Sequence, residues 1–366
     1  MKQIAIIAVI AGIAAVLPLV IGESPYFTGV LISVLMMAAL ASAWNILGGY
    51  AGQYSFGHAA YFGAGAYTTM ILISKFNLNP ILSMVAGIVV ACIIALVTGS
   101  IVFRLRGHYF GLASIAVAEI VRLSALNFDF TGGAQGILLT DVSLWGVDLN
   151  SKTPFYYGML LVLVVTLGIA LSLRTSKTGY YLQAIREDQD AAASLGINLA
   201  FYKNKALLIS AALTSVLGSL YAVYIRFIDT SAVLDLRLSI EIILTAIIGG
   251  VGTVWGPVLG AVLLVPLAEM LRSNVIGDAL VKQGMVSETS GLGVFLKENL
   301  AHAHVLVYGI ITVLCILYLP KGILGLFGRK KRYSIFFISI MSASISGAML
   351  LFRTSVFLWM KSRFLD

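Results

Sequence analysis

The chain has 366 residues, of which 60% are hydrophobic and only 11% charged, and its formal net charge is +8. Soluble domains contain about 25% charged residues, so a chain this poor in charge would not keep its apolar surface in water. The composition also excludes a disordered chain, a collagen, a coiled coil and a disulfide-stapled secreted domain, and it leaves a polytopic membrane protein. Because the apolar residues come in long blocks, we expect helices rather than a β-barrel.

Apolar runs of about 20 residues, the length that crosses a bilayer, follow one another along the chain. They cover 4–22, 28–47, 59–74, 81–103, 109–126, 155–173, 206–228, 240–270 and 304–319, with a further apolar stretch at 333–352. We therefore predict an all-α transmembrane bundle of about eight to ten spans, with broken or re-entrant glycine-rich segments and a retained first helix. Residues 1–330 form the predicted transmembrane domain, and 331–366 form a C-terminal appendage of unknown role.

The first polar interruption is the glycine-rich segment 45–69, which lies between two apolar runs. Its glycines permit close helix contact or irregular backbone. Two interpretations stay open: a cytoplasmic turn followed by a packing helix, or a segment that lines a translocation route or supports its gate. A lone histidine is more often hydrogen-bonded than proton-carrying. The candidate residues are Gly52, Gln53, Ser55, Gly57 and His58.

Ionisable residues at membrane depth occur in two of the runs. Glu119 and Arg122 are three residues apart in the run 109–126, and they are therefore neighbours on one helical face. Such a pair is a functional candidate by default, and a self-neutralising structural pair is an equal alternative. Glu241 opens the run 240–270 near the outer face, where it binds a partner or serves as an interfacial or N-terminal helix residue.

The segment 174–205 is the only long charged stretch between strong apolar runs. Its lysines and arginines place it in the cytoplasm by the positive-inside rule. The positive net charge is therefore interpreted as a signal of membrane orientation rather than of nucleic-acid binding. Residues 179–195 are typical of a short amphipathic helix, with Gly196 as its C-cap. A surface helix on the lipid and a docking helix for a cytoplasmic partner both fit. The predicted apolar face consists of Tyr181, Ile185, Ala192 and Leu195.

The run 240–270 conflicts with that orientation if it is a single span. The basic cluster at 329–332 would then lie outside the cell, against the positive-inside rule. Glycines and a Gly256-Pro257 pair at the centre of the run disfavour a continuous helix. We therefore predict an even number of crossings or a re-entrant hairpin, whose halves meet within the membrane. The candidates for the path or its moving joint are Gly249, Gly250, Gly252 and Gly256.

The chain lacks the sequence signatures of common enzymes. It contains no Walker A loop for ATP, no zinc-protease motif and no serine-hydrolase elbow. We therefore expect no catalytic residue, no metal ligand and no cofactor site in this chain.

Six stretches, taken in order, resemble the membrane permease subunit of branched-chain amino-acid ABC importers, specifically the larger of its two paralogous permeases. The resemblance covers about residues 28–330. The stretches are GYAGQYSFGHAAYFGAGAY (49–67), HYFGLASIAVAEIVRL (108–123), TGGAQGI (131–137), AIREDQDAAASLGIN (184–198), SIEIILTAIIGGVGTVWGPVLGA (239–261) and LPKGILGL (319–326).

The fourth stretch adds a mechanism. Importer permeases carry a cytoplasmic coupling helix with an E-A-A-x-x-x-G core, and this chain keeps that spacing with Asp in place of Glu. The resemblance implies that this helix sits in a cleft of an ATP-binding subunit and passes its closure to the membrane helices. The implied coupling residues are Arg186, Glu187, Asp190, Ala191, Ala192 and Gly196.

The resemblance also implies the partners: a paralogous permease, two subunits that bind ATP and Mg, an extracytoplasmic substrate-binding protein and membrane lipid, but no nucleic acid. The expected function is import of branched-chain or related hydrophobic amino acids across the plasma (inner) membrane of a prokaryote, driven by ATP hydrolysis on the partners. The chain itself would then be no enzyme. The alternatives are a urea or short-amide ABC permease and, from another class, an ion-coupled secondary transporter or channel.

Overall fold

The computed structural model describes residues 2–21, 25–103, 105, 108–139, 143–144, 147–148, 151–272, 309–310, 313 and 322–327. The chain divides into two compact units, Met1–Ala261 and Val262–Asp366, which are treated separately. The predicted boundary at 330, the basic cluster at 329–332, the stretch 333–352 and most of the run 304–319 lie outside the described residues. In the second unit, the structure describes the end of α12 and a short helix, α16 (Gly322–Phe327).

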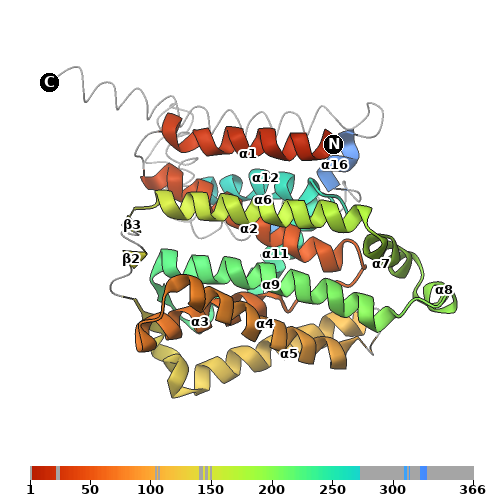
Figure 1. Ribbon diagram of the computed structural model, residues 1–366, viewed down its shortest axis with the longest axis horizontal. Coiled ribbons are helices and arrows are strands. Elements are labelled where there is room, and N and C mark those ends of the chain that lie inside the picture. The colour runs from red at the N-terminus through yellow and green to blue at the C-terminus, as the bar shows by residue number, and fades with distance from the viewer. Residues whose placement is uncertain are drawn as a thin grey trace, which may run out of the picture. The chain divides into compact units, whose positions relative to one another are not determined.

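The described part of the first unit is built almost entirely of helices, which confirms the predicted fold class (Figure 1). Two short antiparallel strand pairs occur, β1 (Ile137–Leu138) with β4 (Phe227–Ile228) and β2 (Ser143–Leu144) with β3 (Val147–Asp148). The 3-10 turns are η1 (Asp129–Thr131) and η2 (Gly133–Gln135). The helices are α1 (Lys2–Ile21), α2 (Pro25–Gly48), α3 (His58–Phe76), α4 (Pro80–Val102), α5 (His108–Asn127), α6 (Thr153–Thr175), α7 (Lys177–Glu187), α8 (Gln189–Ser194), α9 (Leu199–Ile225), α10 (Thr230–Val233), α11 (Leu236–Gly249) and α12 (Gly256–Arg272).

Helices lie at each predicted apolar run from 4–22 through 240–270, and the number of spans, eight to ten, stays a prediction. Five of the described helices, α2, α4, α5, α6 and α9, are long and apolar enough to cross a membrane. A helix satisfies every interior backbone donor and acceptor within itself, which is the condition for crossing hydrocarbon. With this composition, the chain is a multi-pass membrane protein.

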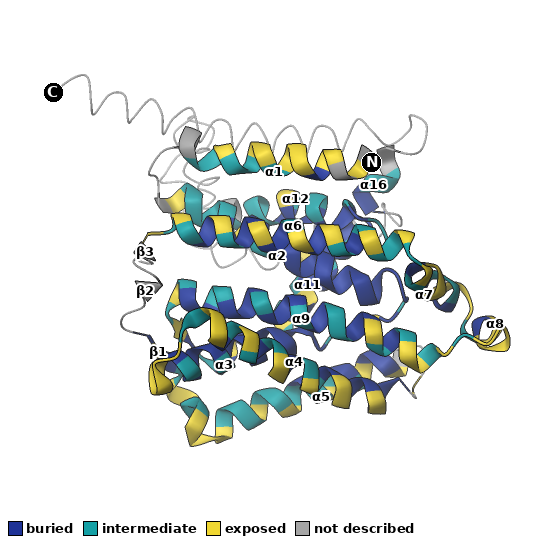
Figure 2. Ribbon diagram, in the orientation of Figure 1, coloured by how far each residue is buried: buried dark blue, intermediate teal, exposed yellow. Residues whose placement is uncertain are grey.

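Burial separates inner helices from outer ones (Figure 2). In their most apolar windows, α2 and α9 have 72% and 67% of their residues buried, against 28% for α4 and for α5. The outer face of α4 presents many aliphatic side chains, such as Leu82, Val89 and Val97. Such a face suits contact with lipid.

Glycines allow the inner helices α3 and α9 to meet backbone to backbone. A Cβ atom built on Gly65 would lie 2.2 Å from the Ser215 carbonyl oxygen, and one on Gly218 would lie 2.0 Å from that of Phe62. A hydrogen bond between two hydroxyl groups joins the same two helices: Thr69 Oγ1 of α3 donates to Ser219 Oγ of α9 at 2.8 Å. Lipid tails are as apolar as leucine, so close packing and hydrogen bonds of this kind stabilise the bundle.

The bundle has two distinct ends. Helices α7 and α8 project from one end, and β2 and β3 lie at the other (Figure 1). At the β end, pairing of Ile137 with Ile228 joins the loop after α5 to the end of α9. We call the end that carries α7 and α8 the α7–α8 end; that it faces the cytoplasm stays a prediction of the positive-inside rule.

The α3–α9 contact yields the first prediction. A leucine at Gly218 forces the two backbones apart, and overpacking of this kind costs about 1–3 kcal/mol. We expect Gly218→Leu to lower the melting temperature of the detergent-solubilised protein. Gly168→Leu is the matched control, because nothing lies within 4 Å of a Cβ atom built on Gly168. Equal melting temperatures for both variants would contradict the packing.

Candidate functional site

Three segments that are far apart in the sequence meet at the α7–α8 end of the bundle. They are the loop 49–57 that follows α2, the helix α7, and the turn 250–255 between α11 and α12. The turn and the loop are the glycine-rich interruptions noted in the sequence, and α7 belongs to the charged segment. We call their meeting place the Arg186 junction. Its residues are Asn45, Gly49, Gly52, Arg186, Gly252 and Thr253.

The run 240–270 is two helices, as predicted, and glycines bring them together. A Cβ atom on Gly249 would lie 1.8 Å from the Gly256 carbonyl oxygen, and one on Gly260 would lie 2.1 Å from the Thr245 carbonyl oxygen. This pattern is that of two antiparallel helices in backbone contact. The turn is closed by Thr253, whose Oγ1 donates to the Gly250 carbonyl at 2.7 Å and accepts from the Gly256 amide at 3.0 Å.

Asn45, near the end of α2, holds this turn in place. Its Nδ2 donates to the Thr253 carbonyl at 2.8 Å, and its Oδ1 accepts from the Gly252 amide at 2.8 Å. The Asn45 side chain is buried. A buried amide needs partners for both its donor and its acceptor, and here one turn supplies both. The sequence analysis did not select Asn45, although a lone amide at the end of an apolar run is a detectable signal.

Arg186 of α7 lies between the loop and the turn. One guanidinium nitrogen donates to the Gly49 carbonyl at 2.8 Å, just beyond the end of α2, where the helix dipole favours a cation. A Cβ atom on Gly52 would lie 3.0 Å from Arg186 Cγ, and one on Gly252 would lie 2.4 Å from the same guanidinium nitrogen. Both glycines have positive φ angles, 66° and 78°. The arginine therefore fits only because both neighbouring positions lack side chains.

The loop side of the junction also contains a buried phenol. The Tyr50 side chain is buried, and this burial raises the pKa of its hydroxyl to about 12. The positive charge of Arg174 acts in the opposite direction and lowers this pKa. The phenol therefore stays neutral at physiological pH.

The predicted single helix over 179–195 is wrong in its middle. The chain breaks at Asp188, which is extended and whose Oδ1 accepts from the amides of Asp190 at 2.8 Å and Ala191 at 3.0 Å. Asp188 thus caps a second helix, α8. The predicted end at Gly196 is confirmed: its φ is 81°, and the Ile197 amide donates to the Ala192 carbonyl at 3.1 Å. This is the Schellman arrangement.

The break changes which side chains are buried. Ile185 is fully buried and Ala192 is 2% exposed, as predicted for the inner face. Leu195, predicted on that face, is 81% exposed. The interruption at Asp188 resets the helical phase, so residues after it no longer continue the face of α7. Leu195 is left as an exposed apolar side chain at the end of α8, and Glu187 and Asp190 of the same segment are also exposed.

Lys203 fixes the start of α9 against α8. Helix α9 begins at Leu199 rather than at the predicted 206, because Asn198 caps it by accepting from the Phe201 amide at 3.0 Å. Lys203 is therefore helical and is 2% exposed, and its Nζ donates to Gln189 Oε1 at 2.8 Å. Sequence reasoning counted this lysine only as a loop charge.

The predicted polar patch of the loop is folded inward. Gln53, Ser55 and His58 are all buried. The Ser55 carbonyl accepts from Trp44 Nε1 at 2.8 Å, and a Cβ atom on Gly57 would lie 3.0 Å from the Ser114 carbonyl. These contacts are those of a turn and packing helix, and a role of the patch in a route or gate stays a prediction.

His58 has a partner within the bundle. Its Nε2 lies 2.7 Å from Ser210 Oγ, and that hydroxyl donates its proton to the Ala43 carbonyl at 2.7 Å. The serine therefore accepts, and His58 Nε2 donates. This arrangement fits the hydrogen-bonded alternative that the sequence analysis left open.

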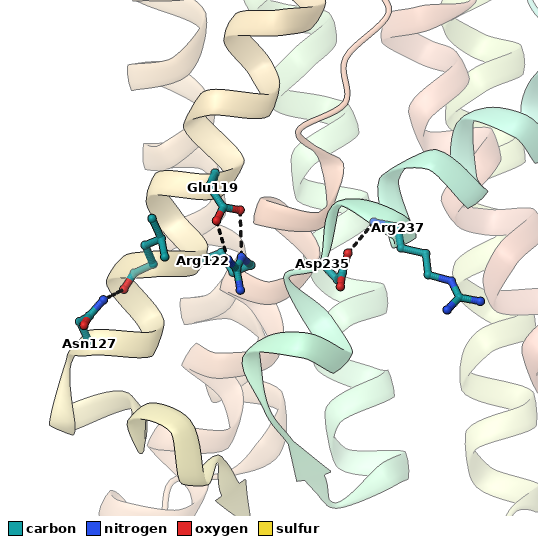
Figure 3. A network of polar contacts seen from close by, with 6 residues as sticks. Glu119, Arg122, Asn127, Asp235 and Arg237 are labelled. Carbon is teal, nitrogen blue, oxygen red and sulfur yellow. Dashed lines mark hydrogen bonds and ion pairs between the residues drawn. The ribbon is translucent and has the colours of Figure 1, made fainter.

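The predicted pair of intramembrane charges is present on α5. Arg122 donates to Glu119 through Nε at 2.9 Å and through a terminal nitrogen at 2.5 Å (Figure 3). Glu241, the third candidate, is paired with Arg237 at 3.2 Å on the first turns of α11. Among the described residues, no group of three or more His, Cys, Asp or Glu is placed to hold a metal ion.

Comparison of the sequence with known proteins places the chain in a family. Residues 26–287 match the family described as branched-chain amino acid transport system / permease component. The high-affinity branched-chain amino acid transport permease LivM of Salmonella typhimurium is 27% identical over 253 residues, which cover 62% of this chain and 59% of the relative. LivM of Escherichia coli K12 is 28% identical over the same shares. A probable LivM of Methanocaldococcus jannaschii is 23% identical over 72% of this chain and 77% of its own length.

The chain thus spans about 59% of the length of the first two relatives. No solved structure matches it.

The bonds of Asn45 yield the second prediction. Asn45→Leu leaves the Gly252 amide and the Thr253 carbonyl without their partner, and each orphaned buried group costs about 1–3 kcal/mol. We expect a lower melting temperature and faster hydrogen exchange at 250–255. Asn127→Leu is the control, because its side chain bonds only to Leu123 on the exposed end of α5. Unchanged exchange in the Asn45 variant would show that the side chain does not hold the turn.

Proposed function

The chain belongs to the branched-chain amino acid transport permease family, and on that premise we propose that it forms half of the translocation path of an ABC importer. It is a transport subunit and not a catalytic enzyme. The proposed cargo is a branched-chain or related hydrophobic amino acid, carried into the cytoplasm across the plasma membrane of a prokaryote. The proposed partners are a paralogous permease, two ATP-binding subunits that carry ATP and Mg, and an extracytoplasmic substrate-binding protein.

The Arg186 junction is the observation that carries this proposal. The α7–α8 segment projects beyond the bundle, and through Arg186 it contacts both the end of α2 and the α11–α12 turn. A push on α7 therefore reaches two membrane elements at once. The positive φ angles of Gly52 and Gly252 mark positions where the backbone turns between rigid helices. In the proposed cycle, ATP-driven closure of the partner subunits moves α7 and α8, and these glycine turns act as the joints.

The tip of the segment suits a protein partner. Leu195 is 81% exposed, and the exposed carboxylates of Glu187 and Asp190 lie on the same segment. An apolar anchor within a polar rim is the usual arrangement of a binding hot spot. We propose that Leu195 enters the cleft of an ATP-binding subunit and that Arg186, Glu187, Asp190, Ala191, Ala192 and Gly196 shape the segment that presents it.

Two rivals define the decisive assays. A urea or short-amide permease would have the same architecture, so competition between leucine and urea for uptake separates the cargoes. An ion-coupled secondary transporter would be active as a lone subunit, whereas the proposal requires co-purification with an ATPase.

The exposed tip yields the third prediction. Truncation of a central interface anchor typically costs about 2 kcal/mol or more, which is roughly a thirtyfold loss of affinity. We expect Leu195→Ala to weaken co-purification with the ATP-binding subunit by that order. Leu138→Ala is the control, since Leu138 is 64% exposed at the opposite end of the bundle. Full retention of the ATPase by the Leu195 variant would remove this anchor from the proposal.

The junction yields the fourth prediction. A leucine at Gly252 would collide with the Arg186 guanidinium and would strain the positive φ angle. We expect Gly252→Leu to reduce ATP-driven leucine uptake in proteoliposomes by about tenfold or more, while the ATPase stays bound. Gly133→Leu, at a φ of 53° on the far end, controls for backbone strain alone. Normal uptake by the Gly252 variant would show that this turn does not move during transport.

A further inference from the structure

Helix α5 carries a partly exposed ion pair between its middle and its Asn127 end. Glu119 lies about 16 Å along the axis from His108, at a rise of about 1.5 Å per residue, in a hydrocarbon core of about 30 Å. The side chains of Glu119 and Arg122 are 45% and 31% exposed. The pair is therefore at membrane depth but is not enclosed by this chain.

An ion pair that is only partly covered does not suit contact with lipid. The comparable outer face of α4 is aliphatic at Leu82, Val85, Val89, Ile93 and Val97. Charged side chains within membrane-spanning segments almost always face a bundle interior or a water-filled cavity. We therefore infer that this face of α5 borders a polar space, which is completed by other subunits of the complex.

The pair has a defined orientation. Arg122 holds Glu119 through two hydrogen bonds, and it points to the side of α5 on which Asp235 lies (Figure 3). Asp235 caps α11, because its Oδ1 accepts from the Arg237 amide at 2.8 Å. The Arg237 side chain turns away from this group toward Glu241, so the second ion pair is separate.

We propose that Glu119 and Arg122 form a station for the head group of the transported amino acid, which rests on the proposed function. Arg122 accommodates the carboxylate of the substrate, because a guanidinium recognises a carboxylate through paired hydrogen bonds. Glu119, together with the nearby Asp235, receives the ammonium group. The neighbouring side chains of Ile120 and Leu123, 64% and 42% exposed, offer an apolar flank for the branched side chain.

The charge balance of this station suits such a substrate. A free amino acid at neutral pH carries one positive and one negative group, and so does the resting pair. An arriving zwitterion therefore exchanges partners with Glu119 and Arg122 without leaving a net charge at membrane depth. A neutral amide such as urea gains no comparable exchange, so the station would select for amino acids.

The kinetic test uses the complete complex in proteoliposomes. We expect Arg122→Gln to raise the KM for leucine uptake by about tenfold or more, since a charge-assisted pair to the carboxylate is lost, with subunit assembly retained. The exchanged variant Glu119→Arg/Arg122→Glu restores an ion pair on the helix but places a carboxylate beside Asp235, and uptake should stay impaired. If the exchange restores full uptake, the pair is only structural and the proposal is overturned.

The accessibility test asks what the face borders. In a chain with Cys92 and Cys315 replaced by Ser, Ile120→Cys should react with a membrane-impermeant thiol reagent, and leucine should slow the reaction. Val89→Cys on α4, 53% exposed, is the control and should stay unreactive. An unreactive Ile120→Cys, or one whose reactivity ignores leucine, would show a lipid or subunit contact and overturn the proposal. A wild-type complex that takes up no leucine would instead refute the proposed function.

Discussion

The hydrogen bond from Arg186 to the Gly49 carbonyl is the contact on which the architecture of the α7–α8 end depends. It joins the projecting α7–α8 segment to α2, and the same guanidinium fills the space left by Gly252 in the α11–α12 turn. Asn45 closes the arrangement from the other side by bonding to that turn. A single arginine of α7 therefore contacts both the end of α2 and the α11–α12 turn, which lie far apart in the sequence.

In lipid, the hydrophobic effect does not drive helices together, so the helices of this bundle depend on close packing and hydrogen bonds. Its inner helices meet where glycine lets one backbone approach another, as at Gly65, Gly218 and Gly260. Hydroxyl bonds such as Thr69 to Ser219 supplement these contacts. The same residue type thus serves two purposes, since glycine inside the helices tightens the packing and glycine at positive φ between them forms the turns.

Charged side chains occur in two different settings outside the closely packed interior. On the projecting α7–α8 segment, Glu187, Asp190 and Leu195 are all exposed, which fits a protein partner. On α5, Glu119 and Arg122 compensate each other at membrane depth, an arrangement that fits a polar space and a zwitterionic substrate. Lys203, by contrast, is buried and serves to fix α8 against α9. The surface of the chain thus separates its proposed contact with an ATPase from its proposed contact with cargo.

The sequence by itself determined the helical bundle, the apolar runs, the reversal near 250 and the helix end at Gly196, because each follows from local hydrophobicity or from glycine. Its motifs also indicated the permease family, which the family match confirmed. Only the tertiary structure decided the break at Asp188, the exposure of Leu195 and the partners of Asn45, Lys203 and Arg186. Those features depend on how distant segments pack, and a local pattern carries no information about which backbone carbonyl will lie opposite a given side chain.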